Sequence, residues 1–479
     1  MKDRLFNRQF LFTTSNRFDL PWECIKIANF NLYHHPNIEL TQLQTPKVEL
    51  YLLGFLLDYE VPSLSNLQIL EHLSQFSIFT DFCNALNRYS GQFVVIYKSE
   101  TDFIIVTDAC AHYEVYYDTT FSTFGTQPKL LEKVVVAEEH TNPEAIEFFS
   151  KPPFLVKKVF VGNTTHRSNI LHLLPNHFID INKKSIARFF PAIPRIEISV
   201  DEAATKAISM LKGYIKAASL RTKLAMGVTA GYDSRILFLM SLETECEYFI
   251  FKHRNMSNDH YDIVTPQKLT AIHGKAFEVI PDAIEKDTTP DYDLLQSIDF
   301  PRGQFKSEKL FENHFYINGF VSEIARNYYG YTKNITAADL SYLNGYPNNP
   351  YVEKICADWL NKNAKSINDL GYNFLDLFYW EEKMGNWGAK AKTEAALDRV
   401  IYSPFCSRDL LITLLATNRK YRDSHLNVLY NRIIKILSPK ASKIPINPCL
   451  MQRIIRLMKI LRVFNLYRTL GLKFHWLNI

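Results

Sequence analysis

The sequence offers little that would cross-link the chain or anchor it in a membrane. Its 7 cysteines are odd in number, are widely separated and form no Cys-x-x-Cys pair. This argues against a disulfide framework and against a structural zinc site. The first residues lack the apolar segment of a signal peptide, and no later stretch is uncharged over the length that spans a bilayer. We therefore expect a cytoplasmic protein.

A strong excess of charge of one sign is also missing. The chain has 55 Lys and Arg residues against 50 Asp and Glu residues, and a formal net charge of +5 over 479 residues does not imply a nucleic-acid partner. A hydrophobic share of 47% with 22% charged residues is typical of globular proteins. The length suffices for two or three domains.

The pattern of the chain changes at Pro191 and Pro194, two closely spaced prolines that discourage regular structure. Before them a helical stretch lies near 69–86, and β-branched and aromatic runs predict strands at 48–57, 92–97, 103–107 and 114–117. After them, strands and helices alternate: helix 201–218, strand 224–228, helix 234–241, strand 248–252, helix 259–273 and strand 277–280. This alternation predicts a parallel sheet, with ligands at the carboxyl ends of its strands. From about residue 369 the chain is predicted to be mainly helical.

A small-residue turn at 229–235 joins the predicted strand 224–228 to a helix, so its backbone N–H groups suit a phosphate chain. Ala230 and Gly231 leave room for an anion, and the Thr229 and Ser234 hydroxyls can donate to phosphate oxygens. Asp233 would repel phosphate unless a divalent cation such as Mg²⁺ lay between them. The alternative is an ordinary turn in which Asp233 and Ser234 cap the helix. No Gly-Lys-Ser/Thr of the Walker A pattern follows.

A second acidic position follows a fourth predicted strand at 315–317. If this strand joins the parallel sheet, Glu323 reaches the same carboxyl edge as Asp233 and can supply a second oxygen ligand to Mg²⁺. Arg326 could neutralise phosphate or hold Glu323 in place. The alternative is an ordinary Glu-Arg pair, three residues apart on a solvated helix.

Several motifs in a fixed order resemble those of one family. The turn resembles the S-G-G-x-D-S loop of the PP-loop ATP pyrophosphatases, with Thr229 and Ala230 in place of the first Ser and Gly. The stretches 91–97, 107–108 and 115–117 resemble the G-R-F, R-D and P-L-Y-Y tracts of the class II glutaminase domain of asparagine synthetase B. Residues 171–178 and 188–191 resemble the segment that closes that domain. Motif order and spacing are similar to those of the asparagine synthetase and β-lactam synthetase superfamily.

This resemblance implies a fold class and a set of site residues. A glutaminase-like β-sandwich domain of the α+β class over 1–194 would precede, over 195–479, an α/β PP-loop domain with a parallel sheet and a helical C-terminal part. Mg²⁺ would bind to Asp233 and Glu323, and Lys443 would stabilise the charge that develops as an acyl-adenylate is attacked. Residues 378–387 and 403–409 would lie beside the acceptor pocket. ATP would bind along the turn, to Thr229, Ala230, Gly231, Tyr232, Asp233, Ser234 and Arg235.

The sequence departs from the family pattern at the glutaminase nucleophile. Class II glutaminases use an amino-terminal cysteine, exposed by removal of the initiator methionine. Residue 2 is Lys2, and the nearest cysteine is Cys24. We therefore expect no glutamine hydrolysis and a first domain that is a structural remnant. Val321 also replaces a glycine of the second metal motif, and Phe320 stands at the position expected for a catalytic tyrosine of the β-lactam synthetases.

The implied function is an ATP-dependent ligase that forms an amide bond with ATP and Mg²⁺ as cofactors. The carboxylate of a small molecule or peptide would attack the α-phosphate and release pyrophosphate, and an amine co-substrate would then displace AMP. The altered turn and the missing tyrosine support a second hypothesis. In that hypothesis the chain is a catalytically degenerate scaffold or nucleotide-binding protein of a biosynthetic cluster.

The C-terminal stretch 453–464 places Arg453, Arg456, Lys459 and Arg462 at every third position among apolar residues. Such a helix could dock on an anionic membrane surface or on a protein partner. The alternative is a terminal helix that covers the core while its cationic side chains reach solvent.

Overall fold

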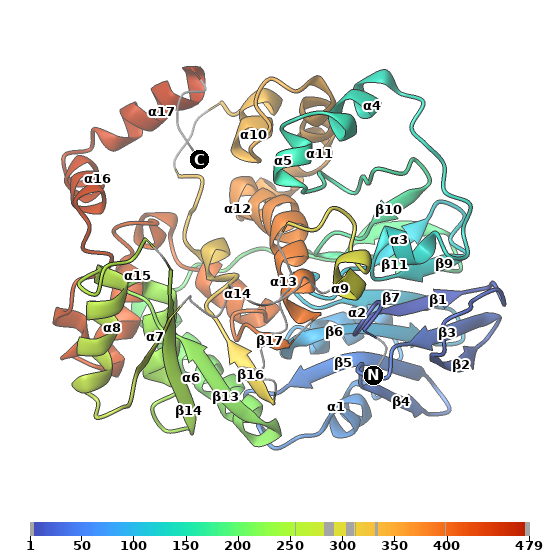
Figure 1. Cartoon of the computed structure of the whole chain (residues 1–479), viewed down its shortest axis with the longest axis horizontal. Helices are drawn as coiled ribbons and strands as arrows, with labels where there is room; N and C mark the ends of the chain where they lie inside the picture. The colour runs from blue at the N-terminus through green and yellow to red at the C-terminus, as the bar shows by residue number, and fades with distance from the viewer. Residues whose placement is uncertain are drawn as a thin grey trace.

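The computed structural model describes residues 4–253, 255–281, 292–302, 311, 313–330, 334–397 and 399–474. Within these residues, the first part of the chain forms two antiparallel sheets (Figure 1). The first sheet has the order β10 (Ile170–His172), β8 (Tyr116–Asp118), β9 (Thr123–Gly125), β1 (Phe10–Thr13), β3 (Phe30–His34) and β2 (Glu23–Ile27). The second has the order β12 (Ser185–Arg188), β11 (His177–Asp180), β7 (Phe103–Thr107), β6 (Ser90–Lys98), β5 (Glu49–Leu57) and β4 (Leu40–Gln44).

The central strands of the second sheet are buried on both faces. In β6, Val94 and Ile96 join the core between the two sheets, whereas Val95 and Tyr97 pack on the opposite face. Helices α1 (Asn66–Leu73) and α2 (Phe79–Leu86) cover that second face. Because side chains of a strand alternate between faces, a strand covered on both sides becomes a continuous apolar run. The predicted helical stretch near 69–86 is therefore two short helices.

The second part of the chain contains a five-stranded parallel sheet with β13 at its centre. Its order is β15 (Glu278–Pro281), β14 (Cys246–Lys252), β13 (Lys223–Gly227), β16 (His314–Ile317) and β17 (Val400–Tyr402). The predicted strands and the intervening helices α6 (Val200–Arg221), α7 (Tyr232–Met240) and α8 (Tyr261–Ala271) are confirmed within a few residues. Strand β17 was not predicted, because three apolar residues carry no readable period.

Helices make up most of the remainder of the chain, as predicted from about residue 369. Those of the first part are α3 (Pro128–Leu131), α4 (Pro143–Ser150) and α5 (Phe154–Lys157). Those of the second part are α9 (Tyr292–Gln296), η2 (Ser322–Ala325), α10 (Ala337–Leu343), α11 (Pro350–Asp369), α12 (Phe374–Phe378), the π-helix η3 (Tyr379–Gly388), α13 (Ala389–Ala396), α14 (Arg408–Leu415), η4 (Arg419–Arg422), α15 (Val428–Leu437), η5 (Ala441–Lys443), α16 (Leu450–Ile460) and α17 (Phe464–Phe474). The predicted fold class is confirmed: an antiparallel sandwich, then a parallel α/β sheet, then helices.

The π-helix η3 ties the two parts together through buried polar contacts. Glu381 is fully buried and accepts hydrogen bonds from Arg188, from Trp359 Nε1 at 3.0 Å and from Asn176 Nδ2 at 3.2 Å. Its neighbour Trp380 donates to the Ala109 carbonyl at 2.7 Å. A buried carboxylate is tolerated when each oxygen is paired in this way. The sandwich ends with β12 and α6 begins at Val200, and the domain boundary at 194 stays a prediction.

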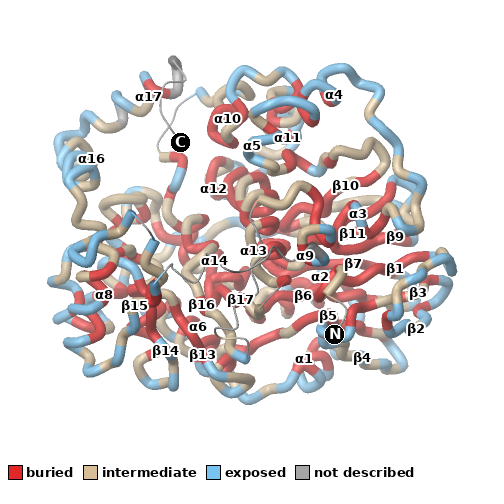
Figure 2. The backbone as a smooth tube through the Cα atoms, viewed as in Figure 1, coloured by how far each residue is buried: buried red, intermediate tan, exposed pale blue. Residues whose placement is uncertain are grey.

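The C-terminal helix α16 does not cover the core. None of its residues is buried, and Figure 2 shows it as an exposed or half-exposed segment at the edge of the molecule. The alternative that this terminal helix covers the core while its cationic side chains reach solvent is therefore wrong. Among the described residues, no helix combines the length and the apolar character needed to cross a membrane.

Gly213 marks the closest approach between α6 and the sandwich. A Cβ at this position would lie 2.1 Å from the Tyr59 carbonyl oxygen. We expect Gly213→Ala to lower the free energy of unfolding in urea by about 1–3 kcal/mol, because the added methyl must push Tyr59 away. Lys216→Ala, at an exposed position of α6, is the control, with an expected change within about 0.5 kcal/mol. Equal effects of the two variants would contradict this contact.

Candidate functional site

The structure brings Asp233 and Glu323 together around one arginine. Strands β13 and β16 are parallel neighbours with Met226 opposite Ile317, so the segments that follow them leave the same edge of the sheet. Arg326 lies 3.3 Å from Asp233 Oδ2 and 3.2 Å from Glu323 Oε1. Because all three side chains are largely buried, Arg326 is not the solvated partner of a surface helix.

The segment after β16 comes this close because of its backbone. A Cβ on Gly319 would lie 2.4 Å from the Cβ of Asp233, so a larger residue there would force the two loops apart. Val321 adopts a φ of 82° and is fully buried. A β-branched residue in this region costs about 1–3 kcal/mol. Val321 thus stands at a position where the backbone favours glycine.

Burial sets the protonation of this group of charges. It raises the pKa of Glu323 to about 7, with Arg326 lowering that pKa and Asp233 raising it further. Burial by itself would lower the pKa of Arg326, but the two carboxylates raise it above its usual value. Arg326 therefore stays charged, and the group carries one net negative charge once Glu323 has lost its proton.

Two oxygen atoms of this group remain available to a cation. Asp233 Oδ1 and Glu323 Oε2 are buried and have no hydrogen-bond partner among the described residues. Mg²⁺ is commonly bound by one or two protein carboxylates, with phosphate oxygens and water in its remaining positions. These residues therefore fit the predicted Mg²⁺, although Arg326 weakens the attraction of the two carboxylates for a cation.

The turn before α7 is held in shape by its own side chains. The N–H groups of Thr229 and Gly231 donate to Ser234 Oγ at 3.0 Å and Thr229 Oγ1 at 3.3 Å, and that of Ala230 donates to Asp262 Oδ1 at 2.9 Å. These three N–H groups are therefore already used. The first-turn N–H groups of α7, whose N-cap Gly231 has no side chain, are left for an anion.

Two residues of the turn do not face this site. The Arg235 guanidinium is fully buried and donates to the carbonyls of Ala441, Ile444 and Pro445. Tyr232 is buried, and its hydroxyl accepts a hydrogen bond from Asn431 Nδ2 at 3.2 Å. Both side chains point into the C-terminal helices and away from the turn. Any contact of Tyr232 and Arg235 with ATP would therefore fall to their backbone, and their assignment to the nucleotide stays a prediction.

Lys443 is exposed at the end of η5. The segment that follows it docks on the turn, where the Asn447 N–H donates to the Ala230 carbonyl at 3.0 Å. No contact joins the Lys443 side chain to the turn within the described part of the chain. Its role in the transfer step stays a prediction.

A buried lysine that the sequence did not single out lies near Glu323. Lys392 Nζ donates to Asn318 Oδ1 at 2.8 Å and lies 5.2 Å from the centre of the Phe320 ring. Burial lowers the pKa of Lys392 to about 7, against the raising effects of acidic groups that include Cys406 and Glu323. Nothing in the alternating Ala and Lys residues of α13 indicates burial, so the sequence carries no signal for this residue.

Folding also gathers two cysteines and a histidine. One ligand atom each from Cys110, His112 and Cys406 lies within 4.8 Å of the others, and all three residues are buried. Two thiols and an imidazole suit Zn²⁺ as thiolates. Here Cys406 donates to Asp108 Oδ1 at 3.2 Å, and burial raises the pKa of its thiol. Burial, and after it the charge of Lys392, lowers the pKa of His112. These surroundings oppose a cation, and the three side chains pack as part of the core.

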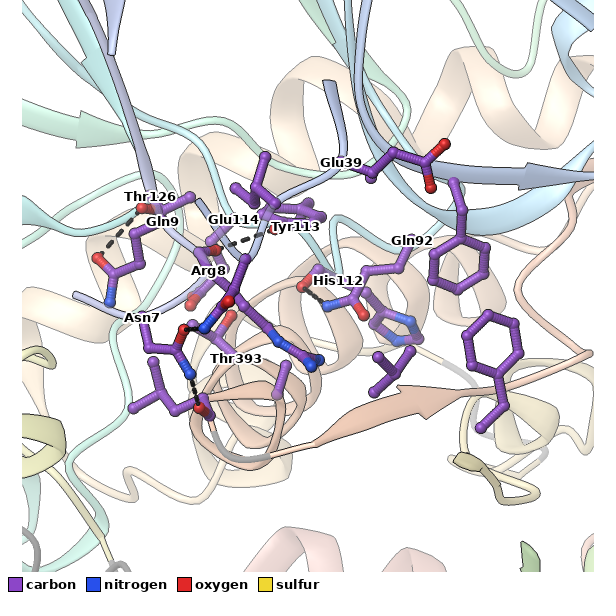
Figure 3. A pocket seen from close by; sticks show the side chains of 18 of the residues that line it. Asn7, Arg8, Gln9, Glu39, Gln92, His112, Tyr113, Glu114, Thr126 and Thr393 are labelled. Atoms are coloured by element: carbon purple, nitrogen blue, oxygen red, sulfur yellow. Dashed lines mark hydrogen bonds between the residues drawn. The ribbon is translucent and has the colours of Figure 1, made fainter. Parts of the chain in front are cut away.

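A hollow of about 320 Å³ lies between the sandwich and the parallel sheet (Figure 3). Asn7 and Gln9, which precede β1, line it together with His112 and Thr393. None of the described residues that line it is a cysteine. Cys24 lies elsewhere, in β2 at the outer edge of the first sheet.

A second hollow, of about 220 Å³, lies in the predicted acceptor region. It is lined by three cationic side chains, Lys157, Arg302 and Lys383, and by Glu382. Burial and the two neighbouring cations lower the pKa of Lys383 to about 8, and burial raises the pKa of Glu382 to about 7.

Two aromatic side chains lie between this second hollow and the segment that carries Glu323. Trp387 lines it, and the centre of the Trp387 ring lies 5.3 Å from that of Phe320. Phe320 stands three residues before Glu323 in the chain. The hollow is thus next to the segment that carries the second predicted metal ligand.

No model of a known protein family and no curated protein matches this chain. Among solved structures, the allosteric regulatory enzyme of purine biosynthesis is similar with a TM-score of 0.25 and 12% identity, over 54% of this chain and 62% of that one. The match thus covers less than two thirds of the length of that enzyme. The glutamine phosphoribosylpyrophosphate amidotransferase from B. subtilis, complexed with ADP and GMP, gives a TM-score of 0.24 and 11% identity, over 62% of this chain and 88% of that one. This is a distant likeness to an amidotransferase fold and carries no argument about function.

The raised pKa of Glu323 makes stability depend on pH. Below the ordinary pKa of 4.5 the side chain is protonated in both the folded and the unfolded chain. As pH rises from about 4.5 to about 7, the unfolded chain loses this proton while the folded chain retains it, so the folded state loses stability until Glu323 ionises there as well. We expect Glu323→Gln to gain stability over the unsubstituted protein as pH rises from about 5 to about 8, on the order of 2 kcal/mol in urea unfolding without Mg²⁺.

Glu144→Gln, at an exposed position of α4, is the control and should show no such trend. A stability difference for Glu323→Gln that stays constant with pH would contradict a raised pKa.

Proposed function

We propose that this protein is an ATP-dependent ligase that forms an amide bond through an acyl-adenylate and does not use glutamine as the nitrogen donor. One observation carries the proposal. Two separate segments at the carboxyl edge of the parallel sheet place Asp233 and Glu323 around Arg326, and each carboxylate keeps one buried oxygen without a partner.

The residues of this edge would divide the binding of the nucleotide among them. Asp233 and Glu323 would hold Mg²⁺, which neutralises the triphosphate and favours departure of pyrophosphate. The Thr229 and Ser234 hydroxyls and the amino end of α7 would bind phosphate oxygens. Arg326, fixed between the two carboxylates, would keep them oriented as the ion binds.

The cationic hollow supports a carboxylate as the substrate to be activated. Lys157, Arg302 and Lys383 line a space of about 220 Å³ beside the metal motif, and three cations favour an anionic group. Glu382 lines the same space, and a carboxyl with a pKa of about 7 can accept a proton from an attacking amine near neutral pH.

Two features support an amine that does not come from glutamine. The described lining of the hollow at the start of β1 contains no cysteine. Cys24 lies in an edge strand of the sandwich, and burial raises the pKa of its thiol, which disfavours the nucleophilic thiolate. The amine would therefore arrive as a free co-substrate.

Asp233→Asn tests the metal site directly. With ATP, Mg²⁺ and a panel of carboxylates, the unsubstituted protein should release pyrophosphate, and the variant should release it at least about 100-fold more slowly because one metal ligand is lost. Asp358→Asn, at an exposed position of α11, should leave the rate unchanged. Undiminished release by Asp233→Asn would overturn the assignment of this residue.

Thermal unfolding with ATP and Mg²⁺ separates the ligase from the scaffold. Saturation about 100-fold above the dissociation constant should stabilise a nucleotide binder by about 2.7 kcal/mol. Stabilisation without pyrophosphate release on any carboxylate would favour a nucleotide-binding scaffold. No stabilisation at all would contradict both the ligase and the nucleotide-binding hypotheses.

A further inference from the structure

We propose that α16 and the start of α17 seat this protein on an anionic membrane surface. This segment exposes a large apolar area. Leu450, Met451, Leu457, Ile460 and Leu461 are each more than half exposed. Other apolar side chains continue the exposed surface at Ile454, Val463, Leu466, Tyr467 and Leu470. Contiguous patches of this kind on a protein surface mark sites of interaction.

Helix α16 is attached to the protein by its polar side. Lys459 Nζ donates to Asp423 Oδ1 at 2.6 Å, and its side chain is only 9% exposed. Arg456 donates to the Ile446 carbonyl at 2.7 Å. A surface helix of a globular protein normally turns its apolar face inward. In α16 the side chains of Arg456 and Lys459 hold the helix in place, whereas apolar side chains such as Leu457 and Ile460 are exposed. Figures 1 and 2 show the exposed backbone of α16 at the edge of the molecule.

The charge of this region favours anionic lipid over other occupants. After Asp423 the last 56 residues, 424–479, contain no Asp or Glu and ten Lys or Arg residues. Arg453 and Arg462 are exposed beside the apolar side chains. A second copy docked through the same face would bring like charges together. Negatively charged headgroups above an acyl layer match both the cations and the apolar surface.

The dimensions of α16 fit an interfacial position. The helix has 11 residues, about half the length that crosses a hydrocarbon core. A helix of this size lies in the plane of the membrane with its apolar side among the upper acyl chains. The catalytic proposal does not depend on this contact, since the helix carries none of the residues assigned to nucleotide or substrate.

Vesicle co-sedimentation of the full chain tests the proposal. With phosphatidylcholine vesicles containing phosphatidylglycerol, we expect binding at least about 10-fold stronger than with phosphatidylcholine alone, weakened by added salt. The double variant I454E, L457E should bind the anionic vesicles at least about 10-fold more weakly. Ile196→Glu replaces a side chain that is 79% exposed outside this segment and should bind like the unsubstituted protein.

The unsubstituted protein decides the outcome even if a variant folds poorly, and circular dichroism of each variant checks its fold. Failure of the unsubstituted protein to sediment with anionic vesicles would overturn the proposal. Equal binding to neutral vesicles would overturn the role of the cations. Self-association that is lost in the double variant, without vesicle binding, would assign this face to a second copy instead.

Discussion

One guanidinium, that of Arg326, allows two carboxylates to share a buried edge of the parallel sheet. Without it, Asp233 and Glu323 would repel each other in a place where water cannot screen them. The cost of this arrangement is visible in the backbone, where Gly319 touches Asp233 and Val321 holds a conformation that glycine favours. Strain of this kind persists where the surrounding structure enforces it, and such positions cluster at functional sites.

The nucleotide turn is preformed by contacts that its own residues and Asp262 supply. Its free capacity for an anion lies at the amino end of α7. The Thr229 and Ser234 hydroxyls bond to each other at 3.0 Å and would turn to a phosphate by giving up that bond. An incoming phosphate would therefore meet fixed donors and would not have to order a loose loop, which lowers the entropy cost of binding. Arg235 contributes indirectly, since it anchors the segment whose Asn447 docks on the turn.

The sandwich and the sheet meet through paired polar groups and not through apolar surface alone. Glu381 on a π-helix binds Arg188 of the last sandwich strand, and the next residue, Glu382, faces the cationic hollow. A π-helical segment changes the side-chain phase of a helix and is frequent at functional sites. The short element η3 thus positions Glu381, which links the two parts of the chain, and Glu382, which we propose accepts a proton from the attacking amine.

The sequence by itself determined the alternation of strands and helices after residue 200, the parallel sheet and, once 315–317 joins that sheet, the convergence of Asp233 and Glu323. Hydrophobic periodicity is local, and the carboxyl ends of adjacent parallel strands always share an edge. Only the tertiary structure decided which side chains face that edge. Arg235 and Tyr232 belong to the turn in sequence, but their side chains point into the C-terminal helices. Lys392, Asp262 and the side chains that line the cationic hollow come from distant segments of the chain. Direction and burial depend on packing between remote parts of the chain, which no local pattern encodes.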